Sequence, residues 1–244
     1  MNAIETMNLT KRYKDVIAVN NFHLTIQHGE LFALLGVNGA GKTTIIKMLS
    51  CLIKPTRGDA IVMGSSILTH AINVKQVINV SPQETAIAPN LSVQENLAFI
   101  AGIYGNKRSL ARLKAQEMID VFDLESIAKQ RAGTLSGGWQ RRLSIAMALI
   151  SQPQVLFLDE PTIGLDVIAR RELWRFINKL KGTMTIILTT HYLEEAEKLA
   201  DRIGIMAAGE LMAVGTVEEI KSLAGCDDFE DAFIKLAMGS EVSP

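Results

Sequence analysis

A glycine-rich loop between a strand and a helix constrains this chain more than any other feature. The apolar run LFALL (31–35) is followed at once by GVNGAGKT (36–43), and KTTIIKMLSCLI (42–53) then has the pattern of a helix. A strand that is apolar on both faces belongs inside a parallel sheet. Glycines at 36, 39 and 41 let the backbone curl so that its N–H groups converge at the helix start. We therefore expect an α/β fold built around this loop.

The loop matches the pattern G-x-x-x-x-G-K-[ST], which holds phosphate when it lies between a strand and a helix. Lys42 is expected to place its charge on the β and γ phosphates, while Thr43 ligates Mg²⁺ and Thr44 donates to the α phosphate. The motif predicts a nucleoside triphosphate and Mg²⁺ as ligands. The nucleotide-binding stretch comprises Gly36, Val37, Asn38, Gly39, Ala40, Gly41, Lys42, Thr43 and Thr44. A glycine-rich turn without a ligand is the alternative, and the flanking strand and helix favour nucleotide binding.

Two adjacent carboxylates follow a second buried strand, VLFL (155–158). Ligands of open α/β sheets bind at the carboxyl ends of the strands, so Asp159 is suited to hold Mg²⁺ through water. Glu160 is suited to polarise the attacking water as general base. Neighbouring side chains on a strand point in opposite directions, which predicts different roles for the two groups. Alone, the pair would be more typical of a solvated acidic turn, but the loop upstream favours catalysis.

The rest of the chain alternates strands with helices and carries one helical block. We expect β structure over residues 1–35 and helical segments with little strand signal over 91–150. The expected fold class is α/β, namely a P-loop NTPase core with a parallel sheet, an antiparallel β edge and an inserted helical subdomain. The expected domains are 1–220, which includes the helical subdomain at about 91–150, and a short C-terminal appendage at 221–244.

Composition excludes the secreted, fibrous, integral-membrane and disulfide-rich classes of protein. The formal net charge is -1, from 25 basic and 26 acidic residues, so nothing in the charge favours a nucleic-acid partner. No apolar run approaches the roughly 20 residues needed to cross a bilayer, and the N-terminal residues lack the apolar core of a signal peptide. Cys51 and Cys226 have no metal-ligand spacing and suit a reducing compartment.

Further motifs stand in a fixed order around these two elements. LSGGWQRR (135–142) precedes a helix upstream of the two carboxylates, and GLD (164–166) follows them. The remaining marks are Tyr13 ahead of the loop, Gln83 in VSPQE and His191 in TTHYLEEAE. In this order the chain resembles the ATP-binding cassette (ABC) ATPases over about residues 1–220. ENLAFIAGIYG (95–105) and the tail DDFEDAFIKLAMG (227–239) look like the ATPase subunits of exporters with separate permeases.

The resemblance assigns roles to single residues. It implies that Tyr13 stacks on adenine, that Gln83 contacts Mg²⁺ or the attacking water, and that His191 is the switch histidine. The implied catalytic set is Glu160, His191, Gln83 and Lys42, the metal set is Thr43, Gln83 and Asp159, and Asp166 belongs to the loop near the dimer face. Taken one at a time, a hairpin tyrosine, a solvated glutamine and a structural histidine are ordinary alternatives.

The signature residues Ser136, Gly137 and Gly138 can form an anion site, because they place a hydroxyl and free N–H groups at a helix start. The resemblance implies that this site acts in trans on the ATP of a second cassette. It therefore implies a homodimer or heterodimer of ATPase subunits at the cytoplasmic face of a membrane, driving a separate integral-membrane permease, with export favoured over import. An ordinary helix cap is the alternative for these three residues taken by themselves.

Two positions depart from the family pattern. Trp139 stands where glutamine is usual, and Ile163 stands where many members have serine. Trp139 borders the phosphate donors and could pack at the pairing surface, while Ile163 could change communication between the two ATP sites. Neither change removes a group that the chemistry requires.

Three rival functions fit the sequence less well than an ABC ATPase of a transporter. ABC ATPases that act on nucleic acid or ribosomes carry coiled-coil insertions or a second cassette. A P-loop kinase for a small molecule would need an acceptor site and lid arginines and would not need LSGG. A regulatory subunit that only binds nucleotide would not need Lys42, Asp159, Glu160 and His191 together.

Overall fold

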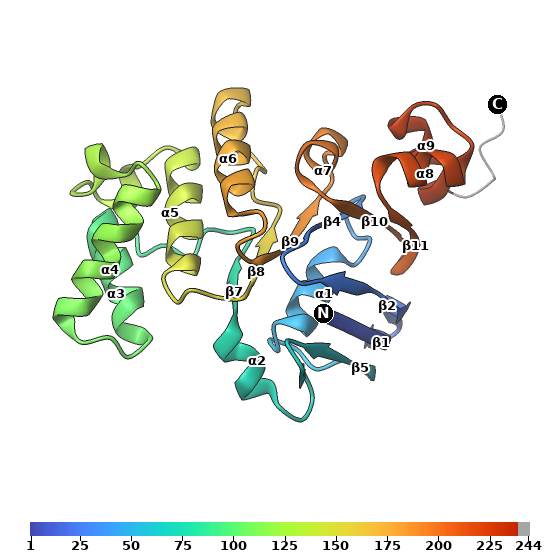
Figure 1. Cartoon of the computed structure of the whole chain (residues 1–244), viewed down its shortest axis with the longest axis horizontal. Helices are drawn as coiled ribbons and strands as arrows, with labels where there is room; N and C mark the ends of the chain where they lie inside the picture. Colours follow the sequence, from blue (N-terminus) through green and yellow to red (C-terminus); the bar gives the residue numbers. More distant parts are fainter. Residues whose placement is uncertain (239–244) are drawn as a thin grey trace.

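A six-stranded mixed sheet forms the centre of the computed structural model, which describes residues 1–238 (Figure 1). Its strand order is β11-β10-β4-β9-β8-β7. All neighbours are parallel except β10 and β11, which form an antiparallel hairpin. The strands are β4 (Leu31–Gly36), β7 (Ile78–Ser81), β8 (Val155–Asp159), β9 (Thr185–Thr190), β10 (Arg202–Ala207) and β11 (Glu210–Gly215). The predicted α/β fold class is confirmed.

A second, antiparallel sheet lies beside the first and provides the predicted β edge (Figure 1). Its order is β2-β1-β5-β6, with β3 paired to β1. The strands are β1 (Asn2–Tyr13), β2 (Val16–Phe22), β3 (Thr25–Gln27), β5 (Arg57–Val62) and β6 (Ser65–Ser66). Helix α1 (Lys42–Leu49) packs between the two sheets, so the residues that follow the glycine-rich loop are held from both sides.

Helix α1 is shorter than the expected helix over residues 42–53. The Ser50 hydroxyl turns back and donates to the Ile46 carbonyl at 2.7 Å, and Cys51 adopts a left-handed conformation with φ of 57°. Both features end the helix. Helix α2 (Ala71–Val77), in which Val74 is the one buried residue, was not predicted.

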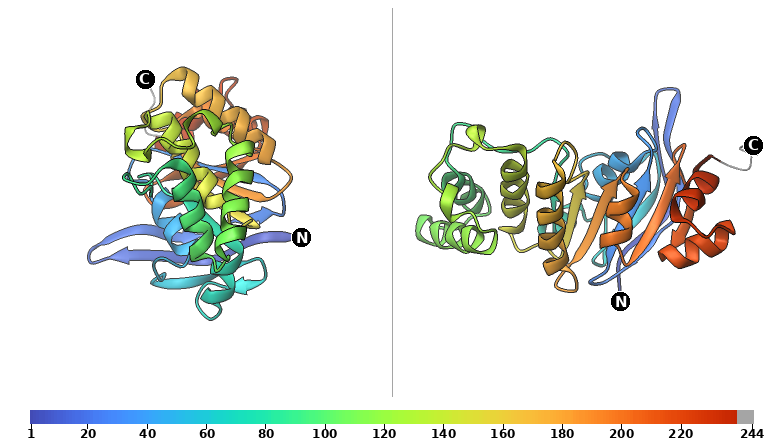
Figure 2. Two further views of the ribbon diagram at one scale, coloured as in Figure 1. Left: turned by 90° about the vertical axis from the view of Figure 1, so that its left-hand side faces the viewer. Right: turned by 90° about the horizontal axis from the view of Figure 1, so that it is seen from above.

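The helical block packs at one end of the central sheet and the C-terminal helices at the other (Figure 2). The block contains α3 (Val93–Ile103), α4 (Arg108–Val121) and α5 (Gly137–Leu149). The remaining helices are α6 (Val167–Leu180), α7 (Leu193–Leu199), α8 (Val217–Ala224) and α9 (Phe229–Met238). The expected appendage at 221–244 is helical over α9, and its last six residues lie outside the described residues. Within residues 1–238 no helix has the length and apolar character needed to cross a membrane.

The central strands divide the apolar core into two clusters, one on each face of the sheet. In β8, Leu156 and Leu158 pack with the helical block and with α6 and α7, while Val155 and Phe157 pack with α1 and the second sheet. Strands β4 and β9 alternate in the same way. Alternation across a strand buried on both faces produces this division. The helical block and the second sheet are therefore both packed against the central sheet. The functional residues lie at the carboxyl ends of its strands.

Candidate functional site

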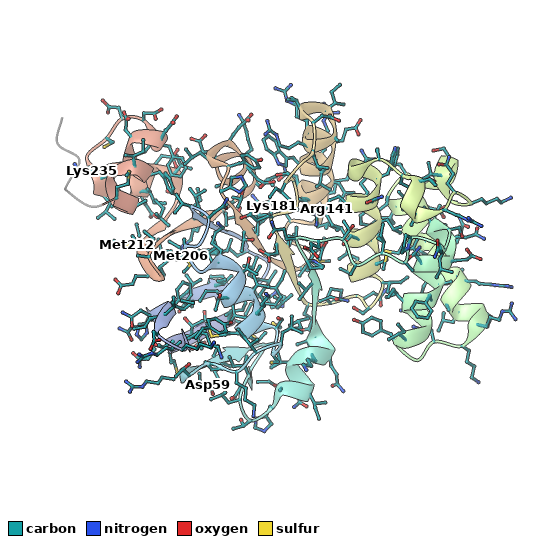
Figure 3. The ribbon with its side chains drawn as sticks, turned by 180° about the vertical axis from the view of Figure 1, so that it is seen from behind. Asp59, Arg141, Lys181, Met206, Met212 and Lys235 are labelled. Atoms are coloured by element: carbon teal, nitrogen blue, oxygen red, sulfur yellow. The ribbon has the colours of Figure 1, made fainter. Side chains whose placement is uncertain are left out.

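The glycine-rich loop leaves β4 and enters α1 through positions that only glycine can fill without strain. Gly41 has φ of 104°, and a Cβ there would lie 2.5 Å from the Ala18 carbonyl oxygen. A Cβ on Gly36 would lie 2.4 Å from the Met206 carbonyl oxygen on β10 (Met206 is labelled in Figure 3). Side chains are therefore excluded at both ends of the loop. The Ala40 N–H donates to the Val37 carbonyl at 3.2 Å and closes the loop. The first N–H groups of α1 have no partner within the helix and can face a ligand at its start.

Lys42 lies at the floor of the loop, with its side chain 5% exposed. Its ammonium donates to the carbonyls of Gly36 at 2.7 Å and Val37 at 3.1 Å, and it lies 3.3 Å from Glu160 Oε1. A cavity of about 330 Å³ opens above it. The cavity is lined by Ala18, Asn38, Gly39, Ala40, Gly41, Lys42, Thr43, Thr44, Gln83, Glu160 and Ile163. Most of the predicted nucleotide-binding stretch thus surrounds one space.

Asp159 ends β8 beneath this cavity and is held by two threonine hydroxyls. Thr43 Oγ1 donates to Asp159 Oδ1 at 3.1 Å, and Thr189 Oγ1 donates to the same oxygen at 2.5 Å. A hydroxyl and a carboxylate at this separation are hard oxygen donors of the kind that Mg²⁺ takes alongside substrate phosphates. Among residues 1–238 no group of three or more His, Cys, Asp and Glu side chains could hold a metal by itself. The donor set fits a metal that is shared with a bound phosphate.

Glu160 connects Lys42 to His191. One carboxylate oxygen faces the ammonium, and the other lies 2.7 Å from His191 Nδ1. We expected the side chains of Asp159 and Glu160 to point apart because side chains alternate along a strand. That reason is wrong, because the strand ends at Asp159 and Glu160 adopts a left-handed turn with φ of 48°. Its backbone N–H donates to Thr189, so the turn is anchored to β9. This turn places both carboxylates beside the phosphate loop.

Gln83 and Ile163 border the cavity from two further loops. Gln83 follows β7 and is exposed, and its backbone carbonyl accepts a hydrogen bond from Arg141 at 2.5 Å. Ile163 follows the two carboxylates, and its N–H donates to the Glu160 carbonyl at 3.2 Å. An apolar side chain therefore occupies the rim next to the predicted general base.

The signature residues lie apart from the phosphate-loop cavity of their own chain. Ser136 is the exposed N-cap of α5, and within the described chain its hydroxyl makes no capping hydrogen bond. A Cβ on Gly138 would approach the Ala169 side chain on α6 at 3.0 Å, which explains a small residue there. Trp139 packs on the apolar core, and Arg142 lies over its ring at 4.7 Å.

Tyr13 and Asp166 are also outside the group of residues that line the cavity. Tyr13 ends β1 with 45% of its surface exposed, and Lys11 Nζ lies 5.0 Å from its ring centre. Asp166 caps α6 by accepting from the N–H groups of Ile168 and Ala169, both at 2.9 Å. Their expected roles in stacking on adenine and in pairing therefore remain predictions.

Three contributors were not found from the sequence. Thr189 anchors both carboxylate-bearing residues, Ala18 lines the cavity, and Arg141 holds the loop of Gln83. The position of Thr189, two residues before His191 and near the carboxyl end of β9, was the available signal, because ligands gather at strand carboxyl ends. Ala18 and Arg141 gave no signal of their own, since their contacts depend on how distant segments pack.

The fold and this cavity define a P-loop protein that binds nucleoside triphosphates. The family described as ABC transporter matches residues 19–163, and the chain belongs to this family. It is 39% identical over 240 residues to the probable multidrug ABC transporter ATP-binding protein YbhF of Escherichia coli, spanning 96% of this chain and 41% of YbhF. It is 41% identical over 211 residues to the doxorubicin resistance ATP-binding protein DrrA of Mycobacterium tuberculosis, spanning 86% of this chain and 64% of DrrA.

Solved structures agree with the family. An ATP-binding subunit of an ABC transporter superposes with a TM-score of 0.84 at 26% identity, covering 96% of this chain and 99% of that one. The ATP-binding cassette MJ0796, in a dimeric post-hydrolysis state bound to ADP and Pi, superposes with a TM-score of 0.79 at 27% identity, covering 87% and 98%. The predicted ABC ATPase cassette is confirmed by these likenesses.

Proposed function

We propose that this chain is the ATP-hydrolysing motor subunit of a membrane exporter whose transport path is a separate permease. The contact chain from Lys42 through Glu160 to His191 is the observation that carries the proposal. It supports hydrolysis because an ammonium, a carboxylate and an imidazole contact one another in series beside the phosphate loop. Binding alone would not need a buried carboxylate opposite that cation, because a carboxylate repels phosphate.

The residues of the site divide the work of hydrolysis. The N–H groups of residues 38–44 and the Lys42 ammonium bind and orient the phosphates. Thr43 and Asp159 would hold Mg²⁺, which neutralises phosphate charge when it is bound. Glu160 accepts the proton of the attacking water, and His191 keeps the carboxylate turned toward that water. Gln83, which reaches the same cavity from the β7 side, helps to position the water.

A second copy, or a similar cassette, would complete each site. Ser136 and the first N–H groups of α5 are exposed and away from their own phosphate loop, which suits them to a phosphate held by a partner. Asp166 and Ile163 lie in the loop that would meet the partner. The dimeric cassette MJ0796 supports this arrangement by structural likeness.

The helical block offers a surface for the permease. A groove between α3 and α4 is lined by the exposed side chains of Phe99 and Ile103 and, at its rim, by Glu95, Arg108 and Arg112. Such an apolar groove with a charged rim suits a short helix of a partner protein. Docking there would hold the ATPase at the cytoplasmic face of the membrane. Relatives named for doxorubicin and linearmycin resistance support export of drug-like molecules.

Hydrolysis and pairing can be tested on the purified chain. We expect Mg²⁺-dependent ATP hydrolysis, and we expect the Glu160→Gln variant to form a dimer when ATP is added, measured by light scattering. A Glu160→Gln variant that binds ATP but stays monomeric at saturation would contradict the pairing. Absence of hydrolysis by the unsubstituted protein, both alone and with its permease, would contradict the motor function.

A further inference from the structure

Arg141 is a buried cation that the proposed chemistry does not use. It lies on α5, the helix that begins with the signature, and only 4% of its surface is exposed (Arg141 is labelled in Figure 3). Burial lowers the pKa of its guanidinium, and the carboxylates of Asp159 and Glu195 act in the opposite direction. A charge in such a place is costly unless hydrogen bonds compensate for the lost water. The groups that accept hydrogen bonds from Arg141 in place of water therefore indicate its role.

Both compensating contacts go to one short segment of backbone. Nη1 donates to the Pro82 carbonyl at 2.6 Å, and Nη2 donates to the Gln83 carbonyl at 2.5 Å. Arg141 makes no ion pair among residues 1–238. A planar guanidinium that binds two successive carbonyls fixes the orientation of both peptide groups. The side chain of Gln83, which starts from one of them, is thereby directed to the cavity rim.

The same face of α5 holds the strand that leads into this segment. Ser144, three residues after Arg141, shares a hydrogen bond of 3.0 Å with Ser81 at the end of β7. Ser151, just beyond α5, accepts from Asn79 Nδ2 at 3.1 Å. Residues three apart on a helix lie on one face. The segment from β7 to Gln83 is thus attached to α5 by polar contacts and follows any movement of that helix.

We propose that Arg141 is a positioning residue that joins Gln83, in the ATP site of its own chain, to the helix whose first residues serve the ATP of the partner. A displacement of Gln83 on binding MgATP is passed through the two carbonyl contacts to α5 and so to Ser136. The coupling rests on the ATPase function proposed above. An apolar residue could fill the same volume, but it would leave both carbonyls without their donor and the segment free to shift.

The experiment compares Arg141→Met, Arg141→Lys and the unsubstituted protein, with Arg175→Met as the matched control. Arg175 is an exposed residue of α6, so the same substitution there should change little. Four quantities are measured: ATP affinity, kcat, KM and the backbone hydrogen–deuterium exchange of residues 82–90 and 36–44. In the Glu160→Gln background, light scattering adds the protein concentration needed for ATP-dependent pairing.

We expect Arg141→Met to lower kcat by about ten- to hundredfold, since small misplacements of positioning groups have costs of this order. ATP affinity should stay within about threefold of the parent, because the phosphate loop is intact. Exchange should quicken at residues 82–90 and stay unchanged at 36–44, and pairing should need more protein. Arg141→Lys should recover part of kcat, because an ammonium can still donate to one carbonyl.

Three results would overturn the assignment. The first is parental exchange at residues 82–90 in Arg141→Met, which would show that Arg141 does not hold the segment. The second is parental kcat and pairing despite faster exchange. The third is a parallel loss of ATP affinity and kcat with no recovery in Arg141→Lys, as expected from a role in stability alone. An unsubstituted protein that hydrolyses no ATP would contradict the proposed function instead, and the exchange comparison would still decide whether Arg141 anchors the Gln83 segment.

Discussion

Exchanging Glu160 for glutamine converts one oxygen of a buried carboxylate into an amide nitrogen at nearly constant volume. The side chain is 8% exposed and lies between Lys42 Nζ at 3.3 Å and His191 Nδ1 at 2.7 Å. The remaining amide oxygen can still accept from one of these two groups. The substitution therefore removes the base and its charge while it keeps the shape of the site.

The magnitude follows from the role assigned to that carboxylate. Loss of a general base lowers a rate by about 10²–10⁴, which is about 2.7–5.4 kcal/mol of activation free energy. ATP affinity should be unchanged or higher, because the phosphate contacts come from residues 38–44 and a repelling negative charge has been removed. Turnover and binding should thus separate in this variant.

Steady-state hydrolysis and equilibrium ATP binding, both measured across a Mg²⁺ titration, test the separation. Glu197→Gln is the control, because Glu197 is an exposed residue of α7 and undergoes the same chemical change. We expect the control to match the parent in both measurements. Glu160→Gln turnover within about tenfold of the parent would refute the assignment of the base, and attention would pass to His191 and Gln83.

The remaining predictions concern other groups of the site and one buried acid. Ser136→Arg should spare ATP binding by the single chain and abolish turnover, whereas Lys42→Ala should lose binding; normal hydrolysis by Ser136→Arg would refute the trans role of the signature. Asp159→Asn should shift the Mg²⁺ concentration for half-maximal hydrolysis upward, and an unchanged midpoint would contradict its place in the metal site. Burial raises the pKa of Glu195, which accepts from Trp174 Nε1 at 2.9 Å. The folded chain then holds that proton more tightly than the unfolded chain, so stability falls as pH rises from the unfolded pKa through the raised one. Glu195→Gln should remove this loss, and urea unfolding at several pH values should show its advantage growing with pH; a constant difference would count against it.

The parts of the site that could be predicted are those that the sequence of a single short segment determines. The strand, the glycine loop and the start of α1 are contiguous, and the loop motif itself marks Gly39 and Gly41, whose left-handed backbone favours glycine. The same holds for Asp159, which had to emerge from a buried strand at its carboxyl end. Such features need no knowledge of the distant packing.

Other features depended on contacts between remote segments. The contact between Glu160 and His191 joins two strand ends, and the family order of motifs implied only that both residues belong to one catalytic set. The left-handed turn at Glu160 is fixed by its bonds to Thr189 on the neighbouring strand, which a strand pattern does not reveal. Helix α2 buries only Val74, so it carries too weak an apolar period to be recognised.

The division of the core by the central sheet limits how this chain can change in evolution. In β8, alternate residues supply the two half-cores, so an insertion or deletion of one residue would send every following side chain to the opposite face. The same slip would turn Asp159 away from Thr43 and Thr189. Substitutions of similar size can accumulate along these strands, but changes of length are confined to the loops and to the helical block. The spacing from the buried strand to the first carboxylate should therefore be more constant among descendants of this chain than the identity of the strand residues.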